Sequence, residues 1–327
     1  MSNQPLRYLS LFSGIGGFDL GFDRAGMTCA GQVEYDEKTR AVLAKHWPDV
    51  KRMNDVREVQ GDEFGTVDLI CGGFPCQDVS VAGRRAGLAG ERSGLWYEFH
   101  RLIDRVRPRW AVIENVPNLL RTNGGGDFAT ILSGLAGSGY LPAWRVLNAL
   151  SWGIPQQRRR LFIVGCYRAG SAAQVLFNGE TGGLVPERES APIAERAFNR
   201  RGGYGWTETQ GYILTLNGGA SESHQGGIET PLVIGDGNMP RWMTPVEVER
   251  CAGFPDNWTD GASNRTRIKQ MMNAVVPQIA EWIARRILEL DAAQAPEFVN
   301  AHNTEVGQAV AIRAKNHTVL QSVFAAV

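Results

Sequence analysis

The chain lacks the features that would place it in a membrane, in an oxidising compartment or around a structural metal. Its five cysteines are odd in number and form no Cys-x-x-Cys pair, which favours neither a disulfide framework nor a zinc site. No apolar run approaches the ~20 residues that span a bilayer. The N-terminus lacks the basic and apolar regions of a secretory signal. We therefore expect a cytoplasmic protein without metal or membrane contact.

The chain also has few lysines and no net charge. Acidic and basic residues balance at 34 each, so net charge predicts no polyanionic partner. Of the basic residues only five are lysine and 29 are arginine. Arginine can bind phosphate and guanine with two parallel hydrogen bonds, although codon bias in a GC-rich genome explains the same excess. The hydrophobic content of 43% and charged content of 21% are those of an ordinary globular protein.

What the chain does contain is a regular alternation of short apolar and amphipathic segments. The pattern predicts strands at 7–12, 28–33, 67–71, 110–113 and 161–165, with helices at 36–46, 94–106 and 128–138. Such alternation is typical of an α/β fold whose mostly parallel sheet has helices on both faces. Another amphipathic helix is expected over 276–290, and Thr244 followed by Pro245 predicts a helix start.

The amino-acid composition changes near residue 167, where a stretch rich in Gly, Ser, Thr and Asn begins. Short β-prone pieces within it favour a loop-rich second domain over an unstructured insert. We interpret 1–166 as a catalytic and cofactor-binding domain, completed by about 265–291. Residues 167–264 form the second domain in this interpretation, and 292–327 are a tail to which no role is assigned.

Cys76 is the strongest candidate for a catalytic residue. It follows the apolar strand at 67–71 through the segment Gly72-Gly73-Phe74-Pro75. It therefore stands past the C-terminal end of a strand, where open α/β sheets bind ligands. Glycine permits a sharp turn and proline stiffens it. Most cysteines are small buried hydrophobes, but a thiol on a rigid loop is suited to act as a nucleophile.

The turn after the first strand predicts a nucleotide site. It comprises Phe12, Ser13, Gly14, Ile15, Gly16 and Gly17. The turn does not match the dinucleotide fingerprint G-x-G-x-x-G, but it directs backbone N–H groups and a helix N-terminus at a ligand. Glu34, at the end of the second strand, can accept hydrogen bonds from ribose hydroxyls. Asp55 can hold an adenine amino group, and Phe12 can stack on the base. Each signal alone is weak, but together they predict an adenosyl pocket.

Two more segments place charged side chains near the same sheet edge. Glu114 follows the strand at 110–113, and Gln156-Gln157-Arg158-Arg159-Arg160 precedes the strand at 161–165. Alternate residues of an extended segment point the same way, so Arg158 and Arg160 share a face. Both features also have non-functional interpretations. Glu114 can be an ordinary negative charge at a helix N-terminus, and the arginines can form a basic surface patch.

Taken together, the motifs resemble those of the DNA cytosine-5 methyltransferases of bacteria and phages. The resemblance covers 8–166 and 241–285. In family order the motifs are Phe12–Gly17, Pro75-Cys76-Gln77, Glu114-Asn115-Val116, Gln156–Arg160 and Gln270–Val275. The resemblance implies a Rossmann-like fold that binds S-adenosylmethionine. It also implies methyl transfer to C5 of a cytosine flipped out of a short, specific sequence in double-stranded DNA, through a covalent bond from Cys76 to C6.

The resemblance also assigns individual roles. Glu114 would stabilise charge at N3 of the base, Arg158 would hold O2, and Arg160 would support Glu114 and the thiolate. Besides residues 12–17, the implied cofactor-binding residues are Glu34, Tyr35, Asp55, Val56, Gly73, Pro75, Leu95, Asn273, Ala274 and Val275. One departure stands out: Met272 occupies the position before Asn273 where the family has glycine, and its side chain could narrow the cofactor pocket.

DNA contacts are expected in two regions. Residues 77–93 match the loop that closes over the flipped base in the family, and 167–240 match its target-recognition region, which is short here. The candidate contacts are Gln77, Ser80, Arg84 and Arg85 in the loop, with Thr215, His224, Gln225 and Arg241 in or beside the recognition region. We expect a monomer. A restriction endonuclease with the same recognition site is a candidate functional partner, without direct contact.

Three rival interpretations stay open. The RNA-methylating branch of the superfamily carries Cys-Phe-Thr where this chain has Cys251-Ala252-Gly253-Phe254. A catalytically silent DNA-binding regulator is disfavoured by the presence of Cys76 and Glu114 together with both motif arginines. A nicotinamide-dependent oxidoreductase is disfavoured by the glycine spacing of the first turn.

Overall fold

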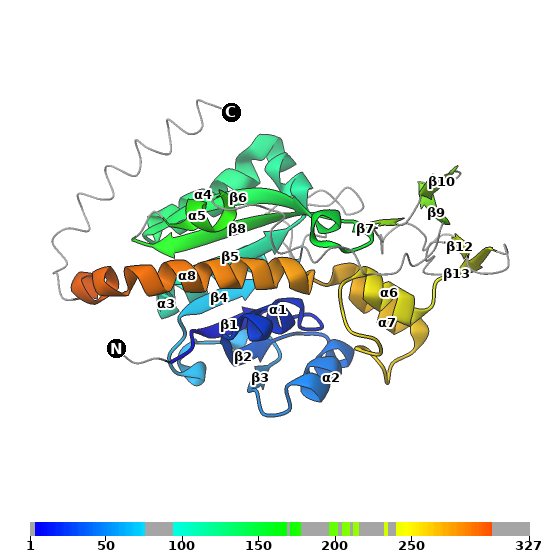
Figure 1. Ribbon diagram of the computed structural model, residues 1–327. Helices are drawn as coiled ribbons and strands as arrows, with labels where there is room; N and C mark the ends of the chain where they lie inside the picture. The colour runs from blue at the N-terminus through cyan, green and yellow to red at the C-terminus, as the bar shows by residue number, and fades with distance from the viewer. Residues whose placement is uncertain are drawn as a thin grey trace.

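Seven strands form one mostly parallel sheet in the computed structural model, which describes residues 4–75, 94–168, 171–177, 196–201, 205–209, 212–215, 232–234 and 240–302. The strand order is β3-β2-β1-β4-β5-β8-β6 (Figure 1). The strands are β1 (Arg7–Leu11), β2 (Thr28–Val33), β3 (Arg52–Met53), β4 (Leu69–Gly72), β5 (Trp110–Asn115), β6 (Tyr140–Asn148) and β8 (Arg159–Tyr167). Strands β1 to β5 run parallel, whereas β8 is antiparallel to both β5 and β6.

Helices cover both faces of this sheet. The α-helices are α1 (Gly17–Ala25), α2 (Glu37–His46), α3 (Leu95–Val106), α4 (Gly126–Gly137), α5 (Ala172–Phe177) and α8 (Pro277–His302). Short 3-10 helices are η1 (Val56–Glu58), η2 (Asp62–Phe64), η4 (Pro117–Leu120), η5 (Thr122–Gly125) and η6 (Ala149–Trp152). Side chains of α1, α5 and α8 share one apolar cluster with the sheet, and those of α3 and α4 share another. The fold class expected from the alternation is thereby confirmed.

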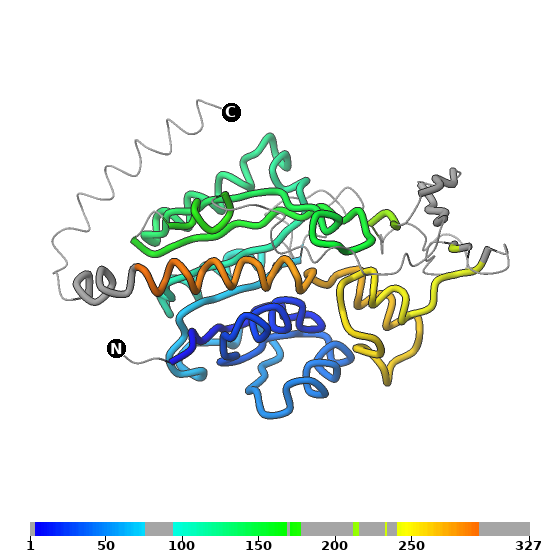
Figure 2. The backbone as a smooth tube through the Cα atoms, in the orientation of Figure 1, coloured from blue at the N-terminus to red at the C-terminus, as the bar shows by residue number. Residues whose placement is uncertain are grey.

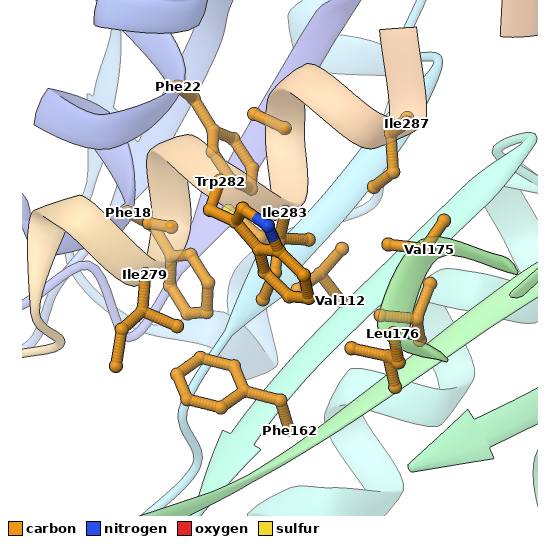
Figure 3. Packing of buried hydrophobic residues seen from close by; sticks show 14 of the residues in the cluster. Phe18, Phe22, Val112, Phe162, Val175, Leu176, Ile279, Trp282, Ile283 and Ile287 are labelled. Atoms are coloured by element: carbon orange, nitrogen blue, oxygen red, sulfur yellow. The ribbon is translucent and has the colours of Figure 1, made fainter. Parts of the chain in front are cut away.

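The central strands are mostly apolar because both of their faces are buried. In β5, Trp110 and Val112 belong to the cluster with α8, and the alternate residues Ala111 and Ile113 belong to the cluster with α3 and α4. Figure 3 shows Trp282 of α8 among the side chains of α1, β5, β8 and α5. The last described helix therefore completes a core that the first helix begins, as the adjacent traces of α1 and α8 also show (Figure 2).

Smaller elements lie beyond one end of the large sheet (Figure 1). Strands β9 (Arg196–Arg201), β10 (Gly205–Thr209), β12 (Leu232–Ile234) and β13 (Pro240–Trp242) form an antiparallel sheet, and β11 (Ile213–Leu214) pairs with β7 (Gln156–Gln157). They are followed by α6 (Pro245–Cys251) and α7 (Asn264–Asn273). Thr244 caps α6 with a full capping box and Pro245 at the first turn, as expected. The domain limits at 167 and 264 stay a prediction.

Strand β6 and helix α8 differ from the sequence-based expectation. Strand β6 was not expected, because Pro142 interrupts the pattern; β6 is the edge strand of the sheet, where a proline is tolerated. Helix α8 continues to His302, past the expected end at 290. Its Asp291 accepts hydrogen bonds from Arg109 at 2.7 Å and from the indole of Trp110 at 3.0 Å, which ties the helix to the start of β5. None of the described helices combines the length and apolar character needed to cross a membrane.

The core between α8 and the sheet is expected to dominate stability. Replacing the fully buried Ile283 by alanine should lower the free energy of unfolding by about 2–5 kcal/mol, because lost apolar contact and a residual cavity add together. Chemical denaturation of the full chain measures this change. Glu289 is exposed on the same helix, and its replacement by alanine should stay within about 0.5 kcal/mol of the wild type. Equal effects of the two changes would contradict this assignment of the core.

Candidate active site

The C-terminal ends of five parallel strands bring the candidate residues to one edge of the sheet. In strand order from β3 to β5 this edge carries Asp55, Glu34, the turn 12–17, Gly73–Pro75 and Glu114. The antiparallel strand β8 begins at the same edge, because Asn115 at the end of β5 pairs with Leu161. Arg158 and Arg160 therefore arrive beside Glu114. This is the edge at which open α/β sheets bind ligands.

The turn 12–17 is tightly held from both sides. Ser13 donates from its hydroxyl to the carbonyl of Ser10 at 2.9 Å and accepts from the amide of Val33 at 3.2 Å. At Gly17 a Cβ atom would lie 2.2 Å from the carbonyl oxygen of Val275, so only glycine allows this approach. The contact joins the first motif to the last one and places Ala274 and Val275 against the start of α1.

Glu34 lies half-buried beside this turn. Its carboxylate accepts hydrogen bonds from the amide of Gly14 at 2.8 Å and from the amide of Asp36 at 2.9 Å. Burial raises the pKa of Glu34, and these two amides oppose the increase. Two backbone donors fix the orientation of the carboxylate, and its remaining lone pairs can accept from a ligand. Tyr35, next in the chain, is 74% exposed and offers an aromatic face at the surface.

Asp55 caps the 3-10 helix η1 and is paired with a neighbour that we did not predict from the sequence. The guanidinium of Arg57 contacts both carboxylate oxygens, with Nε at 2.9 and 3.0 Å from Oδ1 and Oδ2. Val56 between them is buried in the cluster under α3. Arg101 of α3 donates to the carbonyls of Val56 at 3.1 Å and Val59 at 2.9 Å, which fixes the backbone of this segment.

Glu114 is a buried carboxyl group with a charged partner. Its Oε1 lies 3.1 Å from Nε of Arg160. Burial raises the pKa of Glu114, and the positive charges of Arg160 and Arg158 oppose this increase. A Cβ atom at Gly73 would lie 2.8 Å from Oε2 of Glu114, so the backbone leading to Pro75 passes directly over the carboxyl group. The structure thus brings together Glu114, Arg160 and the segment that precedes Cys76.

Asn115 also holds this segment, although we assigned it no role of its own. Its side-chain amide donates to the carbonyl of Phe74 at 3.2 Å, and its Oδ1 accepts from the amide of Val116 at 2.9 Å. A polar residue that ends an otherwise apolar strand was the available signal. Asn115 thereby ties the loop after β4 to the end of β5.

Arg158 differs from the expectation. Both of its terminal nitrogens, expected to hold O2 of a cytosine, donate instead to the carbonyls of Met272 at 2.9 Å and Ala274 at 2.7 Å. These carbonyls lie at the C-terminal end of α7, where a positive charge is favourable. Arg158 is 3% exposed. In the structure Arg158 thus ties the segment before β8 to the last motif; which arginine holds O2 of the base stays a prediction.

Other candidates are placed or lie outside the described residues. Leu95 is partly buried at the start of α3, and Asn273 is exposed at the end of α7. Thr215 donates to the carbonyl of Gln157 at 2.5 Å, so the expected recognition region touches the arginine motif. Arg241 is half-exposed and pairs with Glu247 at 2.6 Å. The candidates outside the described residues are Cys76, Gln77, Ser80, Arg84, Arg85, His224 and Gln225.

Comparison with known proteins identifies the family. The sequence profile of the C-5 cytosine-specific DNA methylases matches residues 6–181 and 187–289, most of the chain. The chain belongs to the C-5 cytosine-specific DNA methylase family. This confirms the family that the motifs resemble and the enzyme class, DNA (cytosine-5-)-methyltransferase.

Relatives of the methylase include bacterial type II methyltransferases. M2.BsuMI of Bacillus subtilis is 33% identical over 303 residues, which span 86% of this chain and 75% of the relative. M.HhaI of Haemophilus parahaemolyticus is 27% identical over 315 residues, which span 86% of this chain and 94% of the relative. These names also agree with the expected connection to restriction and modification.

Solved structures share the fold of this methylase. The Dnmt2 methyltransferase of S. pombe superposes with a TM-score of 0.64 at 16% identity, over 88% of this chain and 99% of that chain. A putative DNA modification methyltransferase encoded in an E. coli prophage gives a TM-score of 0.62 at 20% identity, over 87% and 99% of the two chains. At these identities the likeness shows the fold alone, and it confirms the expected Rossmann-like methyltransferase class.

The family's glycine is replaced by Met272, and the structure shows where its side chain goes. Met272 is 4% exposed and belongs to an apolar cluster with Ile15, Val42 and residues of α6 and α7. The partly buried Trp47 packs against the same cluster. The thioether side chain, which can fill irregular gaps, thus packs in the apolar cluster beneath the first motif.

Replacing Met272 by glycine should therefore cost stability and leave cofactor affinity unchanged. We expect the free energy of unfolding to fall by about 3–5 kcal/mol, through a cavity and a helical glycine. Denaturant unfolding measures the loss, and titration calorimetry with S-adenosylhomocysteine measures affinity. Met271 is buried in the same cluster, so Met271→Gly is the matched control with a similar loss. Tighter ligand binding by Met272→Gly at unchanged stability would show that the side chain narrows the cofactor site.

Proposed function

We propose that this protein transfers a methyl group from S-adenosylmethionine to C5 of a cytosine within a short, specific sequence of double-stranded DNA. The observation that carries the proposal is the buried Glu114–Arg160 pair under the segment Gly73–Pro75. The same sheet edge carries Glu34 and the turn 12–17. Glu114, which would contact the cytosine, and the residues proposed to bind the adenosyl group therefore lie along the same row of strand ends. Transfer of a group between two ligands requires that both be held close together.

The described residues fit S-adenosylmethionine. Glu34 is fixed by two backbone amides and retains acceptor capacity for ribose hydroxyls. Within the turn 12–17, Phe12 and Gly14 are partly exposed, and the turn precedes the N-terminus of α1, which favours negative charge. Val275 lies against Gly17 of this turn, and Asn273, Ala274 and Val275 are proposed to line the methionine end. When bound, the cofactor supplies an electrophilic methyl group.

In the proposed reaction the chain activates a carbon that is otherwise a poor nucleophile. The Cys76 thiolate forms a bond to C6 of the base, and the displaced electron pair makes the ring an enamine with a nucleophilic C5. After C5 has gained the methyl group, a base removes the proton from C5. The Cys76–C6 bond then breaks, and the electron pair of the C5–H bond restores the ring double bond.

Glu114 and Arg160 stabilise the charge that this addition creates. Because burial raises the pKa of Glu114, its carboxyl group can hold a proton for N3 of the base. Arg160 contacts Glu114, and with Arg158 bound to the carbonyls of Met272 and Ala274, we assign O2 of the base to Arg160. Asn115 holds the approach to Cys76 through the carbonyl of Phe74.

DNA enters this proposal because the ring atoms C5 and C6 are inaccessible within a duplex. The base must be flipped out, at a cost of about a few kcal/mol. Residues 77–93 are proposed to close over it, and the region around Thr215 and Arg241 to read the surrounding sequence. The β7–β11 pairing links that region to the arginine motif. The relatives M2.BsuMI and M.HhaI are bacterial type II methyltransferases, so a restriction endonuclease with the same site is the proposed functional partner in a bacterial cell.

Cys76 provides the first test. Replacing Cys76 by serine should abolish methyl transfer from labelled cofactor to DNA while leaving DNA binding largely intact, because a serine hydroxyl is not ionised at neutral pH. Sequencing methylated DNA from expressing cells identifies the recognition site needed for the assay. A duplex with 5-fluorocytosine at the target should trap a covalent adduct with the wild type, since fluorine cannot leave as a proton.

The outcomes separate this function from its rivals. Methylation by Cys76→Ser at the wild-type rate would refute the covalent route. Specific duplex binding without any transfer by the wild type would favour a silent regulator, and transfer to tRNA but not to duplex DNA would favour the RNA-methylating branch.

Glu114 provides a second test through pH. The protonated fraction of Glu114 decreases as pH rises through its raised pKa, so kcat of the wild type should decline on the alkaline side. Glu114→Gln should lower kcat about 100-fold or more and remove this decline, because glutamine does not titrate. Affinity for S-adenosylhomocysteine should change less than about twofold. An unchanged alkaline decline in the variant would assign the titration to another group.

A further inference from the structure

We propose that Arg57 is a positioning residue that orients the Asp55 carboxylate toward the amino group of the cofactor's adenine and thereby selects an adenosyl ligand over a 6-oxo purine analogue. This inference rests on the proposed function, because it concerns the ligand from which the methyl group comes. Arg57 lies outside the motifs on which the family resemblance depends. The geometry around Asp55 points to this role.

The carboxylate of Asp55 is held by three N–H groups of one residue. The backbone amide of Arg57 donates to Oδ1 at 3.0 Å, Nε lies at 2.9 Å from Oδ1 and 3.0 Å from Oδ2, and Nη2 lies at 2.5 Å from Oδ2. This side-on approach fixes the plane of the carboxylate as well as its position. The Asp55 side chain is only 16% exposed, whereas that of Arg57 is 62% exposed. Arg57 therefore grips Asp55 from the solvent side.

The position of Asp55 points to the base of a nucleoside. Strand β3 pairs in parallel with β2, with Val33 beside Met53, and the amide of Glu34 donates to the carbonyl of Met53 at 3.1 Å. Glu34 and Asp55 thus follow the ends of neighbouring strands, with Glu34 nearer the turn 12–17. If Glu34 accepts from the ribose, the base attached to that ribose extends toward the adjacent carboxylate.

Counting acceptor sites explains the expected selectivity. An ionised carboxylate offers about four lone-pair sites, and the backbone amide, Nε and Nη2 of Arg57 occupy most of them. What remains suits a single N–H donor, such as the exocyclic amino group of adenine. The Arg57 guanidinium also lowers the pKa of Asp55, so this carboxylate accepts and does not donate. In a 6-oxo purine such as hypoxanthine, a carbonyl oxygen replaces the amino group. The lone pairs of this oxygen would face those of the Asp55 carboxylate, which is repulsive.

Arg57 is not needed to hold the backbone of η1 in place. The backbone of η1 is already fixed by Arg101, which donates to the carbonyls of Val56 and Val59, and by burial of both valines. An exposed ion pair adds little to folding stability. What would be lost without Arg57 is the orientation of the Asp55 side chain, which otherwise samples several rotamers.

Calorimetric binding of two ligands tests this role. S-adenosylhomocysteine carries the amino group, and S-inosylhomocysteine carries a carbonyl oxygen in its place. The wild type should prefer the adenosyl ligand by about tenfold or more. Arg57→Met should bind the adenosyl ligand about five- to tenfold more weakly and the inosyl ligand at least as tightly as the wild type does, because the oriented carboxylate accepts from the amino group and repels the carbonyl oxygen. Arg57→Lys should restore part of the preference, because lysine keeps the positive charge beside Asp55. The restoration should be incomplete, because an ammonium group cannot hold both carboxylate oxygens as a guanidinium does.

Arg105 supplies a matched control. It is exposed on α3 and donates to the side chain of Gln60 near the same segment, without contacting Asp55. Arg105→Met should bind both ligands like the wild type. Thermal unfolding of Arg57→Met should match the wild type, which separates orientation from folding.

The results distinguish the two proposals. Equal weakening of both ligands by Arg57→Met, or no change in either, would overturn the role of Arg57 while the proposed function stands. A wild type that binds no S-adenosylhomocysteine would overturn the proposed function and this inference with it. Selective loss of the adenosyl ligand, reversed in part by lysine, would establish the positioning role.

Discussion

The ion pair between Glu114 and Arg160 depends on a single reversal of strand direction. Strands β1 to β5 are parallel, so their polar ends collect at one edge. A parallel β8 would begin at the opposite edge and carry its arginines away from the site. Because β8 is antiparallel to β5, Arg160 arrives at the end of β5 with its Nε 3.1 Å from the carboxyl group. A buried carboxylate without such a partner would be costly, and the charge of Arg160 opposes the increase in the pKa of Glu114 that burial causes.

A second constraint is that the site is built from distant parts of the chain that leave each other little room. Val275 approaches Gly17 so closely that a methyl group would not fit. The indole of Trp258 donates to the carbonyl of Ile15 at 2.9 Å. Arg158 binds the carbonyls of Met272 and Ala274. The last motif is therefore in contact with both the first turn and the segment before β8, so the two proposed ligand sites share a common support.

The sequence predicted the sheet and its polar edge because continuous apolar strands followed by Gly, Glu or Asp are distinctive. It predicted less where a result depends on three-dimensional partners. Strand β6 was missed because Pro142 is acceptable only at an edge. Alternation placed Arg158 and Arg160 on one face but did not show that Arg158 binds backbone carbonyls. The pairing of Arg57 with Asp55 and the burial of Met272 are likewise matters of side-chain packing. The role of Cys76 lies outside the described residues and stays a prediction.

The packing of α1 against α8 has a consequence for how the protein is made. Phe18 and Phe22 near the beginning of the chain are buried by Ile279, Ile283 and their neighbours near the end (Figure 3). During translation the part of the first helix that α8 covers therefore lacks this cover until more than 250 further residues have been added. Contacts so distant along the chain form slowly, and an uncovered apolar surface invites association in the meantime. A chain that ends before α8 would therefore leave part of its core uncovered.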